Sequence, residues 1–145
     1  MRILWMKPIL PYPPVQGTKR VTLELIRNLA GEHRIRLFAR RLYSGETAQV
    51  EALRREIPGL EVAAPLAPNR VSPLHRVAYR LRVRAAARRG IPPVEAYTAL
   101  PGLLDAFERE VREFRPELVV VEYWYASAYI DRAPGVPAVK ASSEQ

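Results

Sequence analysis

Short apolar segments typical of strands alternate along this chain with amphipathic segments typical of helices, in units of about 30 residues. The apolar runs predict strands at 3–6, 35–39, 60–62, 118–121 and 136–140. Apolar residues at helical spacing predict helices over about 18–30, 44–57, 73–89 and 101–114, with a short one at 127–130. Such alternation is typical of the α/β class. We therefore expect the 145 residues to form one domain, a Rossmann-like, doubly wound parallel sheet.

The segment 118–121 indicates how that sheet is arranged. It is continuously apolar and β-branched after its first residue, which is typical of a central strand covered on both faces. We expect it beside strand 3–6, because the direction of the sheet reverses between these two strands. The predicted strand order is therefore 3-2-1-4-5. In such a sheet, ligands bind outside the carboxyl ends of the strands, near the point of reversal.

The loop from Pro8 to Gly17 joins the first strand to the first helix at that edge. A strand, a glycine-ended loop and a helix N-terminus can hold an anion, because the first-turn N–H groups and the helix dipole face it. At Gly17, a Cβ would keep such a ligand away from the backbone. The loop has one glycine where the dinucleotide fingerprint has three, and it lacks the Gly-Lys-Ser/Thr of nucleoside-triphosphate loops. The loop is therefore either an anion-binding site or a purely structural turn, and the sequence leaves both interpretations open.

Three polar segments should meet at the carboxyl edge, and Glu122 is the most informative of their residues. It directly follows a buried strand, so its carboxylate must be solvated in a cleft or paired. It would either accept hydrogen bonds from substrate hydroxyls or act as a general base, or it would pair with Lys19 or Arg20. For Trp124 the pattern favours core packing over stacking on a sugar. The predicted binding residues are Gly17, Thr18, Lys19, Glu122, Tyr123, Ser143 and Glu144.

The net charge of +8 is concentrated in one segment. Residues 62–94 contain seven arginines and no acid, so the rest of the chain sums to +1. Ser72 and Pro73 predict the start of the helix there. Leu74, Val77, Ala78, Leu81 and Ala85 fit one of its faces, and Arg76, Arg80, Arg84 and Arg88 form a basic edge at steps of four. This edge is either a solvated surface, a contact with anionic membrane or a lipid-linked substrate, or, least favoured, a nucleic-acid site.

Composition excludes several classes of site. There is no cysteine, which excludes disulfides and thiolate metal ligands, and the two histidines, His33 and His75, lie too far apart to suggest a metal site. No apolar run approaches the roughly 20 residues that span a bilayer. Met1 and Arg2 lead directly into a strand rather than into a signal peptide. We therefore expect a cytoplasmic protein, with peripheral contact at the inner face of the membrane if the basic edge binds lipid.

Three motifs of the chain resemble those of retaining glycosyltransferases with the GT-B fold. The opening MRILWMKPILPYPPVQG is similar to the family-4 pattern M-[KR]-I-L-x-x-x-P-x-x-P-Y-P-P-x-x-G. Residues 115–123, RPELVVVEY, resemble x-P-D-x-V-x-x-E, and residues 135–139, GVPAV, resemble G-x-P-x-V. The three occur in the family's order and spacing. Two departures are Thr18, where the family often has a second glycine, and Ser142-Ser143-Glu144, where it commonly has a histidine.

The resemblance implies a two-domain enzyme that transfers a sugar from a nucleotide-diphosphate sugar to a glycan or lipid-linked acceptor. The chain would be its N-terminal, acceptor-side domain, with Gly17 in the loop that approaches the donor diphosphate. The donor-binding domain would be absent, so we expect an apparently truncated half that is inactive alone. The nucleotide sugar would be a co-substrate, and no cofactor is implied. The alternatives are a standalone Rossmann-like module that binds an anionic or lipid-linked partner, and a small nucleotide-binding protein.

Overall fold

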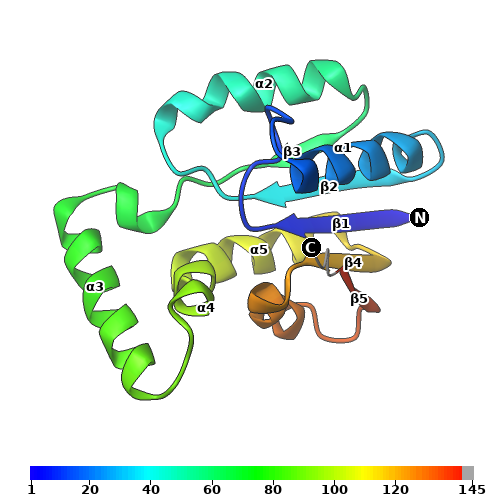
Figure 1. The fold of residues 1–145 in the computed structure, drawn as a ribbon. Coiled ribbons are helices and arrows are strands. Elements are labelled where there is room, and N and C mark those ends of the chain that lie inside the picture. The colour runs from blue at the N-terminus through cyan, green and yellow to red at the C-terminus, as the bar shows by residue number, and fades with distance from the viewer. Residues whose placement is uncertain (142–145) are drawn as a thin grey trace.

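A computed structural model describes residues 1–141, which form a five-stranded parallel sheet with helices on both faces (Figure 1). The strands are β1 (Arg2–Lys7), β2 (Arg34–Ala39), β3 (Glu61–Ala63), β4 (Leu118–Glu122) and β5 (Ala138–Ala141). Their order is β3-β2-β1-β4-β5, and every neighbouring pair is parallel. The predicted α/β class, strand order and position of 118–121 beside the first strand are confirmed.

Strand register aligns the carboxyl ends of the three central strands. Lys7 pairs with Ala39 across β1 and β2, while Met6 pairs with Val121 across β1 and β4. Glu122, one residue beyond Val121, therefore lies at the level of Lys7. Because all strands run the same way, these ends meet at one edge, on the left of Figure 1.

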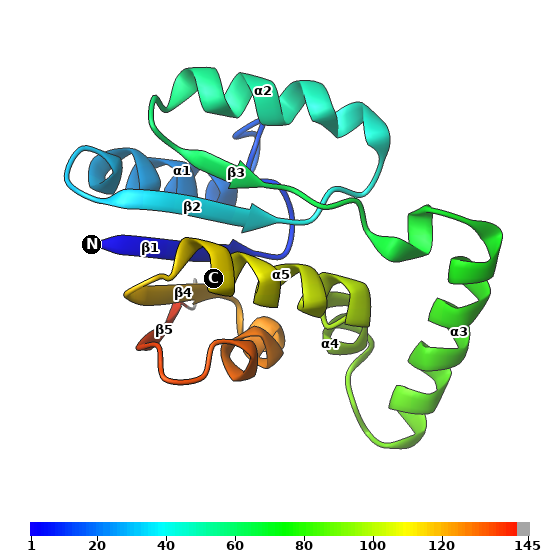
Figure 2. The same ribbon diagram turned by 180° about the vertical axis from the view of Figure 1, so that it is seen from behind.

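Alternate residues of β1 supply two separate cores. Ile3 and Trp5 face α1 (Gly17–Ala30) and α2 (Thr47–Glu56), where Ile26 and Leu53 are fully buried. Leu4 and Met6 face the opposite layer, formed by α5 (Pro101–Phe114) and the 3-10 segment η3 (Trp124–Arg132). This alternation is the period-two rule of a pleated strand. With a core on each face, the sheet is doubly wound (Figures 1 and 2).

Three local expectations for helices differ from the structure. The predicted helix start at 44 is a 3-10 turn, η1 (Ser44–Glu46), and α2 follows it. The short helix expected at 127–130 is the longer 3-10 segment η3. On α1, Val21 and Leu25 are largely exposed, and Thr22 and Leu23 are buried in their place together with Ile26. The helix is rotated relative to its apolar stripe because Thr22 has a polar partner inside the sheet edge.

The helix α3 (Pro73–Arg88) begins as predicted. Its N-cap Ser72 accepts a hydrogen bond from the backbone N–H of His75. The helix stands beyond the carboxyl edge of the sheet and is joined to the body through the 3-10 turn η2 (Pro68–Arg70) and the short helix α4 (Pro93–Thr98) (Figures 1 and 2). Contact with the body comes from the side that carries Ala86 and Tyr79, whose ring lies edge-on to Tyr97.

The apolar face of α3 therefore points away from the protein core. Leu74, Val77 and Leu81 are 77%, 53% and 60% exposed, although they form the helical stripe that would ordinarily be buried. Large contiguous apolar surface on a monomer commonly marks an interaction site. The basic edge of Arg76, Arg80, Arg84 and Arg88 is exposed on the same helix.

Candidate functional site

Glu122 is the centre of a buried polar cluster at the carboxyl edge. Its carboxylate forms an ion pair with Lys7 and accepts hydrogen bonds from the indole N–H of Trp5 at 2.7 Å and from the hydroxyl of Thr22 at 2.7 Å. Lys7 is 0% exposed and also lies 2.8 Å from the Thr22 oxygen. Trp5 and Lys7 come from β1, Thr22 from α1 and Glu122 from β4. The cluster therefore ties together three elements that surround the point of strand reversal.

Two environments were predicted for the Glu122 carboxylate, solvation in a cleft or pairing with a cation, and this arrangement shows which one is present. The carboxylate is 7% exposed and paired, so it is not solvated in an open cleft. Its cation is Lys7, and the expected partners Lys19 and Arg20 were wrong. Sequence reasoning missed Lys7, which directly follows the apolar run 3–6. The observed register explains the pairing: Met6 pairs with Val121, so the residues that follow them, Lys7 and Glu122, lie at the same level.

The N-terminus of α1 lies beside this cluster and is open. Its N-cap residue Gln16 makes no side-chain capping bond, and the first turn contains no acid. A Cβ built at Gly17 would meet nothing within 4 Å, so the space beside this residue is free. The carbonyl oxygen of Thr18 lies 2.9 Å from the Thr22 hydroxyl oxygen, and Lys19 lies partly exposed in the same turn. The structure thus brings Gly17, Thr18 and Lys19 to the same edge as Glu122.

A small cavity lies beside Glu122 and the first turn of α1. Its volume is about 160 Å³, and its lining includes Trp5, Thr18, Thr22 and Glu122. Pockets for drug-sized ligands generally have volumes of about 300–1,000 Å³, so this cavity is too small for a sugar nucleotide. Glu122 holds Lys7 and α1 in position through its ion pair with Lys7 and its hydrogen bond from Thr22.

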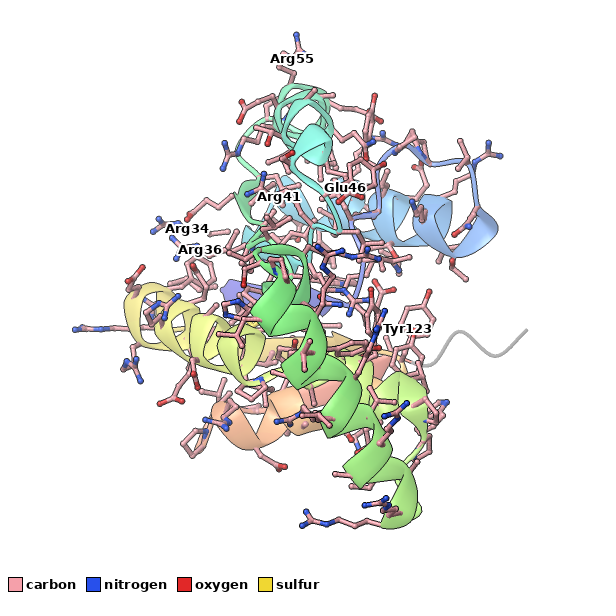
Figure 3. All side chains as sticks on the ribbon, turned by 90° about the vertical axis from the view of Figure 1, so that its left-hand side faces the viewer. Arg34, Arg36, Arg41, Glu46, Arg55 and Tyr123 are labelled. Carbon is pink, nitrogen blue, oxygen red and sulfur yellow. The ribbon has the colours of Figure 1, made fainter. Side chains whose placement is uncertain are left out.

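Tyr123 directly follows Glu122 and has an unusual backbone conformation. Its φ of 71° lies in the left-handed region, and its N–H donates to the carbonyl of Ala141 at 3.1 Å. The ring stacks on Tyr125 with centroids 5.2 Å apart and faces the Lys7 ammonium, which is 5.0 Å from its centroid. A left-handed bulky residue costs about 1–3 kcal/mol and is characteristically found at functional sites. Figure 3, viewed from the carboxyl side, shows Tyr123 to one side of α3.

The next two aromatic residues line the same edge. Trp124 is 59% exposed, so the expectation that it packs in the core was wrong. Tyr125 lies edge-on to Trp124 and is partly buried. Burial raises the pKa of Tyr125, the charges of Tyr123 and Glu122 act in the same direction, and the charge of Arg40 lowers it. Ser143 and Glu144, the remaining predicted binding residues, lie outside the described residues.

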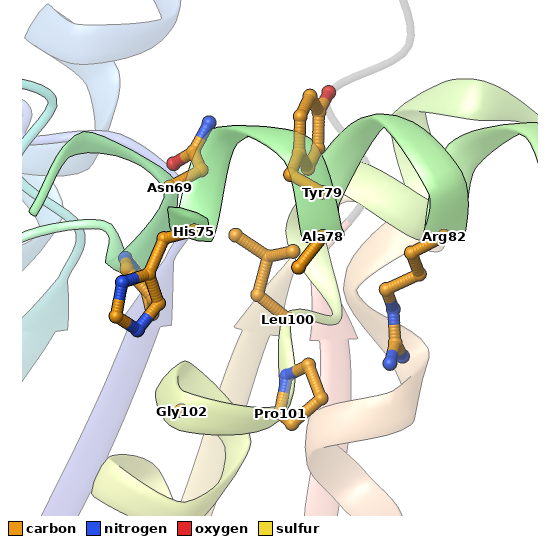
Figure 4. Close-up of a pocket in the computed structure, with 9 residues that line it drawn as sticks. Asn69, His75, Ala78, Tyr79, Arg82, Leu100, Pro101 and Gly102 are labelled. Atoms are coloured by element: carbon orange, nitrogen blue, oxygen red, sulfur yellow. The ribbon is translucent and has the colours of Figure 1, made fainter. Parts of the chain in front are cut away.

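A larger cavity lies between α3 and the start of α5 (Figure 4). Its volume is about 410 Å³, with apolar walls from residues such as Leu100 and Pro101 and a polar rim that includes Asn69, His75 and Arg82. Asn69 is 6% exposed, and its Oδ1 has no hydrogen-bond partner. No sequence motif indicated this cavity, because it depends on where α3 stands relative to α5.

Within residues 1–141, no group of three or more histidine, aspartate or glutamate side chains is arranged to hold a metal ion. None of the helices in that range is both long and apolar enough to cross a membrane. Comparison with models of known protein families and with curated proteins found no match to this chain.

Proposed function

We propose that this chain is the N-terminal, acceptor-side domain of a GT-B glycosyltransferase that uses a nucleotide-diphosphate sugar as donor. The three family-4-like motifs support this assignment, and in the fold they fall on β1 with the loop after it, on β4 with Glu122, and on the approach to β5. In such an enzyme the active site forms between two domains, and the nucleotide-sugar domain is not within these 145 residues. We expect the isolated chain to show no transferase activity.

The observation that carries the proposal is the open N-terminus of α1 beside the Lys7–Glu122 cluster. Free first-turn N–H groups, an empty space at Gly17 and no acid in the turn favour an anion such as a diphosphate. The carboxylate of Glu122 is already neutralised by Lys7, so it adds little repulsion. Trp124 and the stacked pair Tyr123–Tyr125 supply aromatic faces for sugar rings nearby.

Replacing Gly17 by aspartate is expected to weaken binding of a nucleoside diphosphate at least tenfold. The added carboxylate would occupy the space in front of α1 and repel the diphosphate. It would also interact favourably with the helix dipole, so the free energy of unfolding should stay unchanged or rise by about 0.3–1 kcal/mol. Titration calorimetry with UDP and GDP measures the affinity, and urea unfolding measures the stability.

The matched control is Gly17→Ala, which adds a Cβ without charge in the same open space. It should reduce the affinity far less than Gly17→Asp and leave the fold intact. Equal affinity of the wild type and Gly17→Asp for both nucleotides would contradict a diphosphate site at α1.

A second candidate function is that of a module that docks on anionic membrane or on a lipid-linked partner. The observation that favours it is the exposed face of Leu74, Val77 and Leu81 on a helix whose charged residues are all arginines. Apolar residues that insert at the headgroup boundary, flanked by cations, are typical of helices that lie in a membrane interface. The two candidates are compatible, because an acceptor-side domain for a lipid-linked acceptor would work at a membrane surface.

A further inference from the structure

Arg40 is a deeply buried cation that directly follows β2. The residue is 5% exposed, and its Nη1 donates a hydrogen bond to the carbonyl of Tyr97 at 3.0 Å. Its guanidinium lies over the Tyr97 ring, 3.9 Å from the centroid. The Nε atom is buried and has no hydrogen-bond partner. None of these contacts carries a negative charge.

Two other buried or half-buried cations have counter-ions. Lys7 is paired with Glu122, and Arg36, partly buried within β2, is held by Glu61 and Glu110. For Arg40, no carboxylate in the described part of the chain provides an ion pair. Burial lowers the pKa of Arg40, and tyrosines provide the opposing contributions. Because buried charges in proteins are ordinarily paired, an anionic ligand would be favoured at this position.

The surroundings of Arg40 are rich in tyrosine. Tyr79 comes from α3, Tyr97 from α4, and Tyr125 and Tyr129 from η3, and all four act on the charge of Arg40. Tyr129 is buried and its hydroxyl donates to the carbonyl of Thr98 at 2.9 Å. The other three are partly exposed, so the shell around the guanidinium reaches the molecular surface. Such a shell offers hydroxyl donors and ring faces.

Arg40 belongs to the same sheet edge as the Glu122 cluster. Ala39, the residue before it, pairs with Lys7, and Tyr125 is influenced by the charges of both Arg40 and Glu122. The opposite charges of Lys7 and Glu122 neutralise each other. Arg40 therefore leaves a positive charge at the point where parallel sheets bind their ligands.

We propose that Arg40 anchors a site for the phosphate group of a ligand, with Tyr97 and Tyr125 at its entrance against the body of that ligand. Nη1 of Arg40 already donates to the Tyr97 carbonyl. The guanidinium edge that carries the unpaired Nε would therefore donate to the phosphate oxygens. A planar guanidinium can bind two phosphate oxygens at once. Side-chain rotation of a partly exposed tyrosine gives access, a change that is common on binding. The site is separate from the α1 N-terminus and does not depend on the proposed transfer reaction.

The experiment compares the wild-type chain with Arg40→Met, using inorganic phosphate, glycerol 3-phosphate and monomeric dihexanoyl phosphatidic acid as probes in titration calorimetry. At least one probe should bind the wild type, and Arg40→Met should weaken that binding tenfold or more. Arg55→Gln is the matched control, because it removes one exposed arginine on α2, far from the site (Figure 3). Its affinity should equal that of the wild type. Binding of the two soluble probes indicates a soluble phosphate ligand, and binding of the lipid alone indicates a headgroup.

Thermal unfolding separates this site from a purely structural role. Without phosphate, Arg40→Met should have a Tm equal to or above the wild type, because an unpaired buried charge is replaced by an apolar side chain. The binding probe should raise the Tm of the wild type and leave that of Arg40→Met unchanged. If Arg40→Met does not fold, Arg40→Lys provides the comparison, since it keeps the charge and loses the planar two-point contact. Its affinity should still fall.

Two results would overturn the proposal. The first is no binding of any probe to the wild type, and the second is equal affinity in every folded Arg40 variant. In the first case, phosphate binding that appears in Glu144→Gln would mean that the chain supplies the anion itself; Glu144 lies outside the described residues.

Discussion

Replacing Lys7 by methionine is expected to lower the free energy of unfolding by about 3–5 kcal/mol. The substitution keeps much of the side-chain volume but leaves the Glu122 carboxylate buried without its cation. An uncompensated charge in that position cannot be hydrated, because the residue is 7% exposed. Urea unfolding followed by circular dichroism measures the change.

A double variant tests whether the unpaired Glu122 charge is the cause of the stability loss in Lys7→Met. Lys7→Met with Glu122→Gln removes both charges and keeps groups that can bond to Trp5 and Thr22, so it should recover a large part of the lost stability. Lys140→Met removes one exposed lysine, on β5, and should change stability by less than about 0.5 kcal/mol. A double variant no more stable than Lys7→Met alone would show that the ion pair is not the source of the effect.

The same cluster matters for the proposed donor site, because it fixes α1. Thr22 bonds to Glu122 through its hydroxyl, and its position one helical turn after Thr18 determines where the first-turn N–H groups point. The aligned N-terminus of α1 is thus a consequence of a buried ion pair in the sheet. Binding of nucleoside diphosphate should weaken in Lys7→Met even under conditions where that variant remains folded.

The fold could be predicted from the sequence because its signals are local and repeated. Each strand is a short apolar run, and the β-branched segment of β4 indicates full burial and a central place. Once a parallel doubly wound sheet is expected, general rules for such sheets give the strand order. The placement of Gly17 and Glu122 at one edge followed from the same rules and is confirmed.

The partners within the edge could not be predicted in the same way. Which cation reaches Glu122 depends on strand register, which a list of residue types does not contain, so Lys19 and Arg20 were preferred over Lys7. Arg40 was not singled out, because an arginine after a strand ordinarily reaches solvent. Its burial arises from tyrosines of α3, α4 and η3, which are distant in the sequence. Trp124 is exposed although it follows a buried strand, and it comes directly after the positive-φ residue Tyr123.

The helix α3 shows a different failure of sequence reasoning. Its apolar stripe has the period of a core helix, yet that face has no partner within the described residues. The spacing of apolar residues predicts that one face of a helix is buried, but it does not identify the partner that buries it. The predicted basic edge adds a constraint, because a covering surface must also accept the arginines that run along one side of the stripe.

Removing four positive charges from α3 is expected to weaken binding to anionic vesicles at least a hundredfold. Each cation near a negatively charged membrane contributes about 1 kcal/mol, so Arg76, Arg80, Arg84 and Arg88 together contribute at most about 4 kcal/mol. Co-sedimentation of the wild type and the fourfold Arg→Gln variant with anionic and neutral vesicles measures the difference. Binding should fall as salt rises, since exposed charges are screened over about 10 Å at 0.1 M salt.

The structure also predicts which arginines matter most. At 100° per residue, Arg84 and Arg88 lie beside the stripe of Leu74, Val77 and Leu81, while Arg76 lies on roughly the opposite side of the helix. Arg88→Gln should therefore weaken vesicle binding by about fivefold, and Arg76→Gln, its matched control, should have a much smaller effect. Replacing the three apolar residues by alanine keeps the helix intact and should abolish most of the remaining binding. Equal pelleting with neutral vesicles, or tight binding of duplex DNA without vesicle binding, would reject membrane docking by this face.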